Sequence, residues 1–306
     1  MYGNCKYKES ICAIIVTYNP DQRLLINCNQ LIKQVDSIII VNNGPNNSII
    51  NDIVRRKSKR FKIICLDKNI GLAAALNIGI SYVKKDYQWV ITFDQDSIIT
   101  ESFVHYMLEA YNSYPNNESL AIVAPFYKDQ TTGIIQTFRD HKAEGNVLYA
   151  KTTTTNTSGN LIGTHVFDKV GLFREDFFID YIDKEFCLRC MEKGYTIIES
   201  TKACLLHNVG EPRQYKLLWK TPLASNHPPS RRYYITRNRI IVYRQYYRIF
   251  PKWVLGDIYI MIKEIIKILV YEKEKSSKYY WMLRGLRDAL LNKMGSVEKI
   301  AIFSMK

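Results

Sequence analysis

The chain has 306 residues, which suits one large domain or one domain with an appendage. Its composition, 47% hydrophobic and 24% charged residues, is that of a globular protein and excludes an intrinsically disordered chain. The net charge of +14 is carried by the last third: residues 1–200 hold 22 basic and 22 acidic side chains, whereas residues 201–306 hold 21 and 7. The basic third predicts an anionic partner, which is membrane lipid, polyphosphate or nucleic acid.

Two features of the sequence bear on the compartment. The N-terminal stretch 1–10 lacks the apolar core of a signal peptide, so secretion is not expected. The seven cysteines are an odd number, and we expect them to be reduced, as in a cytosolic protein. Cys187 and Cys190 form a CxxC pair, but the pair lies in a helical pattern and no second pair accompanies it. A structural role is therefore favoured over a zinc or redox site.

The first part of the chain alternates strand and helix patterns. Short β-branched or aromatic runs predict four strands, and apolar residues at helical spacing predict helices between them. Such alternation is typical of parallel strands that are covered by helices on both faces. The predicted strands are 11–16, 37–41, 61–66 and 88–93, and the predicted helices are 21–35 and 71–84.

Each predicted strand ends in a polar stretch: TYNP (17–20), NNGP (42–45), DKN (67–69) and DQD (94–96). Ligands of parallel sheets bind outside the carboxyl ends of the strands, so we expect these stretches to line one binding edge. No GxGxxG or GxxxxGKS/T motif follows any strand, which removes the main support for a dinucleotide or P-loop site. A diphosphate would then need a cation, and the DQD acids suit Mg²⁺ or Mn²⁺, although alone they also fit a solvated turn.

From about residue 120 the pattern becomes richer in strands. Asp183 and Glu185 fall at the start of a predicted helix, where exposed N–H groups favour carboxylates, so helix capping is an alternative to a catalytic role. Further along this helix, Phe186, Cys190 and Met191 are expected to face the core. The other predicted elements are strands at 120–125, 133–138, 147–155, 197–198 and 204–206 and a helix at 163–170.

Eight short motifs together carry a family resemblance over roughly residues 10–245. They are VTYNP (16–20), VNNG (41–44), NIGLAAALNIGI (69–80), FDQDS (93–97), SGNLI (158–162), GLFREDFFIDYIDKEFCLR (171–189), LLHNVGE (205–211) and YYITRNRI (233–240). In this order they resemble the inverting nucleotide-sugar glycosyltransferases of family 2 and, within them, bacterial rhamnosyltransferases. Each motif is weak alone, but eight in order are specific.

The resemblance implies a GT-A fold, a Rossmann-like α/β sheet flanked by helices, over residues 1–250, with a helical extension over 251–306. It also implies Mg²⁺ or Mn²⁺ held by Asp96 of a DXD motif, with His207 as a further ligand. Relatives usually have Asp where this chain has Asn42, whose oxygen can still accept from N3–H of uracil or thymine. The implied nucleotide-sugar-binding residues are Thr17, Tyr18, Asn19, Asn42, Asn69, Gly71, Asn77, Asp94, Gln95 and Asp96.

The same resemblance assigns Asp183 as the general base. Relatives frequently have Glu-Asp at this point, whereas this chain has Ile182 before Asp183. Glu185 is the second catalytic candidate, and it would orient Asp183 or the acceptor. Two separate acids are needed, because a carboxylate bound to the metal would be a poor base for the attacking hydroxyl. We expect one in-line displacement that inverts the anomeric carbon.

The implied function is transfer of L-rhamnose from dTDP-L-rhamnose to a lipid-linked glycan in the synthesis of O-antigen or capsule. One alternative is a family 2 transferase that uses a UDP-hexose or another nucleotide sugar. Another alternative is a catalytically silent nucleotide-sugar-binding scaffold. The intact carboxylates Asp94, Asp96 and Asp183 argue against a silent scaffold.

The C-terminal third interleaves arginine with tyrosine and then forms an apolar helical face after Pro251. Charged residues such as Asp257 and Lys263 interrupt this face, which argues against a membrane-spanning helix. We expect a basic amphipathic extension on the inner face of the cell membrane, and hence a cytoplasmic, peripheral protein. Packing on the catalytic domain or in a homodimer is the alternative. No nucleic-acid partner is expected, because the predicted strand-end cluster is acidic.

Overall fold

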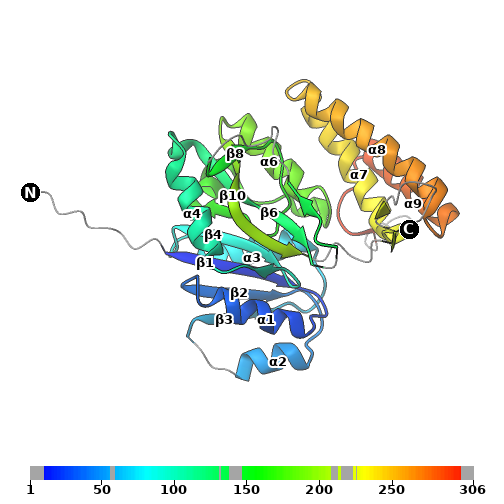
Figure 1. The fold of residues 1–306 in the computed structure, drawn as a ribbon. Helices are drawn as coiled ribbons and strands as arrows, with labels where there is room; N and C mark the ends of the chain where they lie inside the picture. The colour runs from blue at the N-terminus through cyan, green and yellow to red at the C-terminus, as the bar shows by residue number, and fades with distance from the viewer. Residues whose placement is uncertain are drawn as a thin grey trace, which may run out of the picture.

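In the computed structural model, one large sheet with helices on both faces is accompanied by a layer of three C-terminal helices (Figure 1). This architecture confirms the mixed α/β class that the sequence predicts. The structure describes residues 10–55, 59–130, 132–137, 147–207, 213–214, 223–224 and 226–297.

The elements follow one another in strand–helix alternation through α3 and become richer in strands after α4. The strands are β1 (Ile11–Thr17), β2 (Ser37–Asn42), β3 (Phe61–Cys65), β4 (Trp89–Asp94), β5 (Ile98–Ile99), β6 (Leu120–Asp129), β7 (Ile135–Gln136), β8 (Tyr149–Lys151), β9 (Leu161–Gly163), β10 (Thr196–His207), β11 (Arg213–Gln214) and β12 (Leu223–Ala224). The α-helices are α1 (Gln22–Leu31), α2 (Ser48–Arg55), α3 (Leu72–Val83), α4 (Phe103–Ser113), α5 (Thr164–Val170), α6 (Ile182–Glu192), α7 (Pro229–Tyr246), α8 (Pro251–Tyr271) and α9 (Lys275–Leu290).

The main sheet has the strand order β3-β2-β1-β4-β9-β6-β10-β5. Strands β3, β2, β1 and β4 are parallel, as the sequence predicts. Strand β9 is antiparallel to both β4 and β6, so the pairing changes direction beside β4. A crevice outside the carboxyl end of β4 is therefore the place where this sheet can bind a ligand.

The two faces of the sheet bury separate cores, which explains the continuous apolar runs of the central strands. Helices α1, α2 and α4 cover one face, and α3, α5 and α6 cover the other. All residues of β1 are buried, and Ile14 and Ile15 point into opposite cores. Gly79 lets α3 approach β1 closely, because a Cβ there would lie 2.7 Å from Cγ2 of Ile14.

The fold differs from the expected elements in four places. The two short strands expected at 197–198 and 204–206 are one strand, β10, whose pairing with β6 shifts register between Glu199 and Cys204. The polar residues at this irregularity interrupt the hydrophobic pattern and make one strand resemble two. Helix α2 was not expected, and the strand expected at 147–155 is confined to the three residues of β8. Of the strand expected at 133–138, the described part forms only the two residues of β7.

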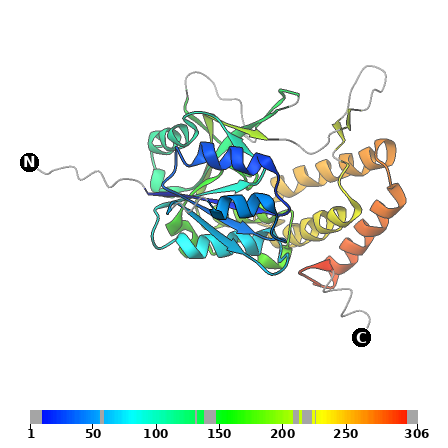
Figure 2. The same cartoon turned by 90° about the horizontal axis from the view of Figure 1, so that it is seen from below.

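Helices α7, α8 and α9 form a layer at one side of the sheet (Figure 2). Helix α7 packs along α9, and the Tyr233 hydroxyl donates a hydrogen bond to the Asp288 carboxylate over 2.9 Å. The helices packed together thus lie on both sides of the boundary at residue 250 that the sequence suggests. Within the described residues, none of the helices combines the length and hydrophobicity that crossing a bilayer requires.

Two glycines in these helices predict opposite responses to alanine. Gly285 lies where α9 meets α7, and a Cβ there would be 2.6 Å from the backbone oxygen of Tyr233. We expect Gly285→Ala to force the helices apart and to lower the free energy of unfolding by about 1–3 kcal/mol. Gly256→Ala on α8 meets no atom within 4 Å and should raise it by about 1 kcal/mol through helix propensity. Chemical denaturation of both variants checks the pair, and equal effects would contradict the α7–α9 contact.

Candidate active site

Two adjoining cavities open at the carboxyl ends of the strands. The smaller one, of about 270 Å³, lies among the loops that follow β1, β2, β3 and β4. The larger one, of about 400 Å³, lies between the end of β4, the start of α6 and the helix α7. Leu72, Asp94 and Ile179 line both cavities, which therefore meet at the end of β4. The expected site residues in the smaller cavity are Thr17, Tyr18, Asn69, Gly71, Asp94 and Gln95, and those in the larger one are Asp94 and Asp183.

Tyr18 presents an exposed aromatic ring at the smaller cavity. Its side chain packs over Gly44, where a Cβ would lie 2.9 Å from the ring, so the absence of a side chain makes room for it. The backbone N–H of Tyr18 donates to Oε1 of Gln95 over 2.8 Å. Gln95 thus ties the loop after β1 to the loop after β4. Asn19, the next residue, is exposed and has a positive φ of 49°.

Asn42, the last residue of β2, lines neither of the two cavities. Its side chain is buried, and its Oδ1 accepts a hydrogen bond of 3.1 Å from the Thr17 hydroxyl. Its Nδ2 donates to the Gly44 carbonyl and to Oδ1 of Asn46, each over 2.9 Å. In this arrangement Asn42 shapes the loop from within and positions Thr17 at the cavity.

The neighbouring Asn43 lines the cavity, as expected for the stretch 42–45, although it was not among the individual residues expected to bind the nucleotide sugar. Its Oδ1 accepts from the N–H of Ile70, and its Nδ2 donates to Oδ1 of Asn69 and to the Gly71 carbonyl. These bonds join the loops after β2 and β3. Gly71 has a φ of +96°, and a Cβ there would lie 2.6 Å from the Phe178 ring, so no larger residue fits this close approach.

Asn77 lies away from both cavities. Its amide is buried in α3, where Nδ2 donates to the Phe173 carbonyl over 2.8 Å and Oδ1 accepts from the Phe173 N–H over 3.0 Å. The side chain therefore holds the segment before α6 against α3. Nothing in the sequence distinguishes this role from ligand binding, because Asn77 belongs to the same motif as Asn69 and Gly71.

Asp94 and Asp96 differ in their surroundings. Asp94 lines both cavities, and its backbone N–H donates to the Ser158 hydroxyl over 3.1 Å. Asp96 is partly exposed, with the Arg23 guanidinium 3.9 Å from its carboxylate. No cluster of three His, Cys, Asp or Glu side chains suitable for a metal occurs among the residues that the structure describes. One or two carboxylates together with substrate phosphates are nevertheless a usual Mg²⁺ donor set, so these residues fit a cation bound with the donor.

His207 was expected to bind the metal, whereas the CxxC pair was expected to be structural. The side chain of His207 lies outside the described residues. Cys187 and Cys190 are both buried in α6, and burial raises the pKa of each thiol, which suits packed structural cysteines.

Asp183 stands at the start of α6 and lines the larger cavity. Its Oδ1 accepts from the N–H of Lys184 over 2.8 Å. Burial raises the pKa of Asp183 from 3.8 to about 6, and the Lys184 charge opposes this effect without cancelling it. A carboxylate with this pKa is a better proton acceptor than an ordinary one and is still mostly ionised near neutral pH.

Glu185 points the other way, into the core. Residues two apart on a helix differ by about 200° in direction, so Glu185 cannot share the cavity with Asp183. Its carboxylate forms an ion pair of 2.9 Å with Arg189 and accepts from the Tyr246 hydroxyl over 3.2 Å. The structure therefore places Glu185 as a partner of Arg189, outside the lining of both cavities.

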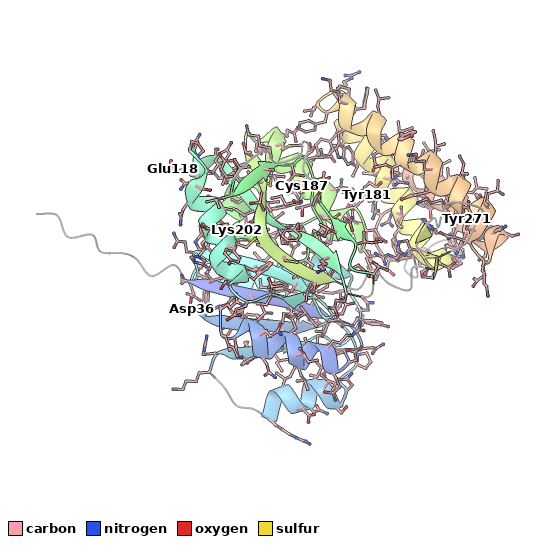
Figure 3. The ribbon with its side chains drawn as sticks, viewed as in Figure 1. Asp36, Glu118, Tyr181, Cys187, Lys202 and Tyr271 are labelled. Carbon is pink, nitrogen blue, oxygen red and sulfur yellow. The ribbon has the colours of Figure 1, made fainter. Side chains whose placement is uncertain are left out.

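The segment just before Asp183 has an unusual backbone. Phe178, Asp180 and Tyr181 have φ values of 67°, 64° and 63°, in the region that non-glycine residues rarely adopt. Each such residue costs about 1–3 kcal/mol unless the surrounding structure holds it. Figure 3 shows Tyr181 at the side of the sheet unit that faces the C-terminal helices.

Buried side chains of α7 hold this segment, a role that was not expected for them. Arg237 and Asn238 are fully buried and donate to backbone carbonyls between Asp176 and Asp180. Arg239 is also buried and contacts the hydroxyl of Tyr181. The signal was present as the RNR stretch of an otherwise mixed helix, because arginines that are buried need several acceptors.

Charged side chains of β4, α6, α7 and α8 line the larger cavity, together with Asp180. Arg231 of α7 forms a salt bridge of 3.0 Å with Asp180, and its side chain is close enough to Asp94 and Asp183 to feel their charge. Although burial alone would lower the pKa of Arg231, Asp180 and these carboxylates raise it. Glu264 of α8 lines the same cavity and pairs with Arg239 over 2.9 Å.

Asp257 connects α8 to the segment before Asp183. Its buried carboxylate accepts from the Tyr181 and Tyr243 hydroxyls over 2.6 and 2.8 Å. It also pairs with Arg239 over 3.0 Å and with Lys184 over 3.2 Å. The C-terminal helices therefore form part of the wall of the larger cavity, and they hold the segment before Asp183 in place.

Comparison with known proteins identifies the class. The sequence profile of Glycosyl transferase family 2 matches residues 12–179, more than half of the chain, and the chain belongs to this family. The dTDP-rhamnosyl transferase RfbF of Shigella flexneri is 31% identical over 254 residues, which are 78% of this chain and 81% of that protein. The poly-beta-1,6-N-acetyl-D-glucosamine synthase of Staphylococcus aureus (strain COL) is 31% identical over 111 residues, but these are only 35% of this chain and 26% of the synthase.

Solved structures agree with this assignment at the level of the fold. TarS 1–349 of S. aureus superposes with a TM-score of 0.59 at 14% identity over 92% of this chain and 80% of that one. GalNAc-T7, solved with UDP, GalNAc and Mn²⁺, superposes with a TM-score of 0.62 at 12% identity over 81% of this chain and half of that one. The expected GT-A fold is confirmed, and the protein is a glycosyltransferase.

Substitutions of Asp183 and Glu185, both in α6, are expected to change the stability in opposite directions. A carboxyl whose pKa rises on folding costs stability once the pH passes its unfolded value, here over the window from 3.8 to about 6. We therefore expect Asp183→Asn to raise the melting temperature at pH 7.5 and to leave it almost unchanged at pH 4. Glu185→Gln breaks a buried ion pair and should lower the free energy of unfolding by about 3–5 kcal/mol. The measurement is thermal unfolding at both pH values. A lower melting temperature of Asp183→Asn at pH 7.5 would contradict the buried environment that raises the pKa of Asp183.

Proposed function

We propose that the protein transfers L-rhamnose from dTDP-L-rhamnose to a hydroxyl of a lipid-linked glycan, with inversion at the anomeric carbon. The observation that carries this proposal is the junction of two cavities at Asp94, with strand-end loops on one side and Asp183 on the other. An inverting displacement needs the leaving group and the base on opposite faces of the sugar, and this arrangement provides both places.

The nucleotide is proposed to bind in the smaller cavity. Thr17, Tyr18 and Asn69 line it, and the exposed Tyr18 ring offers an apolar face for the base. Asn43 lines it as well and adds to the residues expected from the sequence. Asn42 supports this wall through Thr17, so its proposed influence on the base is indirect.

The diphosphate is proposed to lie near Asp94 and Asp96. These carboxylates would hold a divalent cation, Mg²⁺ or Mn²⁺, which supplies Lewis-acid stabilisation of the negative charge on the leaving diphosphate. The GalNAc-T7 structure was solved with Mn²⁺, which agrees with this assignment for the fold. Arg23, 3.9 Å from Asp96, adds a positive charge at the same edge.

Asp183 is proposed to accept the proton of the attacking hydroxyl. It lines the cavity opposite the strand-end loops and has a pKa of about 6. A base with a pKa near the working pH combines the correct ionisation state with adequate basicity. Lys184 and Arg231 keep the surroundings from becoming too negative, since Asp94, Asp180 and Asp183 lie on the same cavity.

The donor sugar is inferred from the relative RfbF, whose description names dTDP-rhamnose, and from its coverage of most of this chain. Rhamnose carries a methyl group where hexoses such as glucose carry a hydroxymethyl group, so it lacks the 6-hydroxyl. A pocket without a partner for that hydroxyl would disfavour hexoses by about 1–3 kcal/mol. The alternatives are a UDP-hexose donor and a catalytically silent nucleotide-sugar scaffold; one TarS structure was solved with UDP-GlcNAc.

The acceptor is proposed to be reached at the inner face of the membrane, in the synthesis of cell-surface polysaccharide. Helix α8 buries only Val254, Asp257 and Ile268. Its outward side carries a stripe of exposed apolar residues at spacings of four and three, which is one helix face. We call this stripe the α8 face; it consists of Leu255, Tyr259, Ile262, Ile266 and Leu269.

The charges beside the α8 face favour an anionic lipid surface over a second protein copy. The acids of α8 turn inward, where Asp257 and Glu264 pair with Arg239. Lys252 and Lys263 stay exposed at the outer side. An apolar stripe flanked by cations suits an anionic bilayer, whereas a symmetric dimer would bring like charges together.

Substitutions of the two acids should separate binding from turnover. Asp183→Asn keeps the shape of the side chain but cannot accept a proton, so turnover should fall by about 10²–10⁴-fold while dTDP binding persists. Asp96→Ala should lose both turnover and the Mn²⁺-dependent part of dTDP binding. Calorimetry and a transfer assay measure the two properties. A wild-type protein that binds the donor without transferring or hydrolysing it would instead support the silent scaffold.

Competition among donors tests the sugar. We expect dTDP-L-rhamnose to be used at least about fivefold better than UDP-glucose, UDP-galactose and UDP-N-acetylglucosamine, as one unpaired hydroxyl implies. The measurement is transfer to a matched membrane extract with all donors present. Preference for a UDP-hexose would overturn the rhamnose assignment and leave the family unaffected.

Flotation with vesicles tests the lipid surface. Removal of residues 251–306 would also delete Asp257 and α9, so point variants are the better probe. Lys263→Glu should float less than the wild-type protein with anionic vesicles, and salt should weaken the binding of both, because surface charges are screened beyond roughly 8 Å at 0.15 M. Lys85→Glu, an equal charge change at the exposed end of α3, is the control. Equal flotation of both variants, with a concentration-dependent mass, would assign the α8 face to a dimer.

A further inference from the structure

The backbone before Asp183 needs support that it does not supply itself. Phe178, Asp180 and Tyr181 all have positive φ values, and the segment ends directly at the first turn of α6, which carries Asp183. A segment of this kind stays in one conformation only when neighbouring groups over-determine it. In this stretch the Phe178 and Tyr181 carbonyls accept from the backbone N–H groups of Leu72 and Glu185, which leaves the Ile179 and Asp180 carbonyls for other donors.

One asparagine of α7 reaches both of these carbonyls and that of the preceding Phe177, sharing its two amide hydrogens among them. Nδ2 of Asn238 donates to the carbonyls of Phe177, Ile179 and Asp180 over 3.0, 2.9 and 2.9 Å. The side chain is fully buried, so water does not compete for these acceptors. The carbonyls of Phe177, Ile179 and Asp180 thus converge on a single amide group.

The preceding arginine extends the same set of contacts. The guanidinium of Arg237 donates to the Phe177 carbonyl over 2.9 Å and to the Asp176 carbonyl over 3.2 Å. Nη1 of Arg237 donates to the carbonyl of Gly295, a residue that follows α9. Arg237 is fully buried and has no carboxylate among these partners, so backbone carbonyls take most of its donors.

We propose that Asn238 and Arg237 are positioning residues that hold the strained segment 178–181 and thereby fix the place of Asp183 in the catalytic cavity. This inference rests on the proposed role of Asp183 as the base. It goes beyond that role because it assigns a catalytic consequence to α7, a helix outside the matched family region 12–179. Neither residue lines a cavity, so both act through the segment that they hold.

Asn77 provides a matched control for Asn238. It too is a buried asparagine whose amide bonds to the backbone of the stretch that leads to α6, through the N–H and carbonyl of Phe173. Its contacts, which include a bond of 3.0 Å to the Glu175 carboxylate, stop short of the strained segment that begins at Phe178. A purely structural asparagine should behave like Asn77 when it is replaced.

The test compares Asn238→Ala with Asn77→Ala in the full chain. We expect Asn238→Ala to lower kcat by about 10²-fold, as displacement of a catalytic group by about 1 Å can do, with the KM for the donor changed less than about threefold. Amide hydrogen exchange in residues 178–183 should accelerate in this variant. Asn77→Ala should change neither kcat nor exchange in that segment, even where it lowers the melting temperature.

A milder variant covers the case in which Asn238→Ala does not fold. Arg237→Lys keeps the charge but replaces the planar fork of the guanidinium with a single donor nitrogen, and it should show the same pattern at a smaller amplitude. The inference is overturned if the α7 variants melt at lower temperature but retain kcat and the exchange rates of 178–183. Asp183→Asn separates this outcome from failure of the proposed function, because an active Asp183→Asn would remove the base whatever the α7 variants do.

Discussion

The site depends on hydrogen bonds from buried side chains of α7 to the main chain before α6. The segment 178–181 turns through three positive φ angles, and its Ile179 and Asp180 carbonyls need partners from another element. Asn238 supplies those partners, and Arg237 binds the preceding Phe177 carbonyl, from a helix about sixty residues further along the chain. Since Arg237 and Asn238 are buried, any helix carrying them must be docked on the sheet unit. The C-terminal helices therefore contribute to the structure of the proposed active site.

The same contacts change how the charge of +14 should be understood. The sequence places the whole excess in residues 201–306 and suggests an anionic partner for it. In the structure, Arg232, Arg237 and Arg239 of this region are buried and bind acids or carbonyls of the protein. The acids of α8 and α9 are also drawn inward, which leaves lysines on the outer side. Several of the basic residues of this region therefore bind the protein itself, so only the exposed lysines and arginines are available to an external anionic partner.

Much of the fold could be predicted from the sequence, because hydrophobic periodicity and polar strand ends are local signals. The four parallel strands, the helices at α1 and α3 and the polar edge were all expected from such signals. The pairing of β9 between β4 and β6, and the continuity of β10, depend on long-range contacts that no local pattern reports. Helix α2 was missed because it is short and flanked by polar residues.

The site residues show the same division. Thr17, Tyr18, Asp94 and Asp183 line the cavities at strand ends and a helix start, where the motifs suggested. Asn77 and Glu185 share those motifs but face the core, since a motif does not report the direction of a side chain on its helix. Arg237 and Asn238 were missed because their main partners are backbone carbonyls that are distant in the sequence. Such partners become visible only when the chain is folded.

The pH dependence of kcat at saturating donor tests the central claim most directly. If Asp183 accepts the proton in the environment that α7 and α8 create, kcat should fall about tenfold per pH unit below about pH 6, following the raised pKa of this carboxyl. Above that point kcat should reach a plateau. A kcat that stays constant down to pH 4.5 would contradict the claim, because it would require a base with the pKa of an ordinary exposed carboxylate.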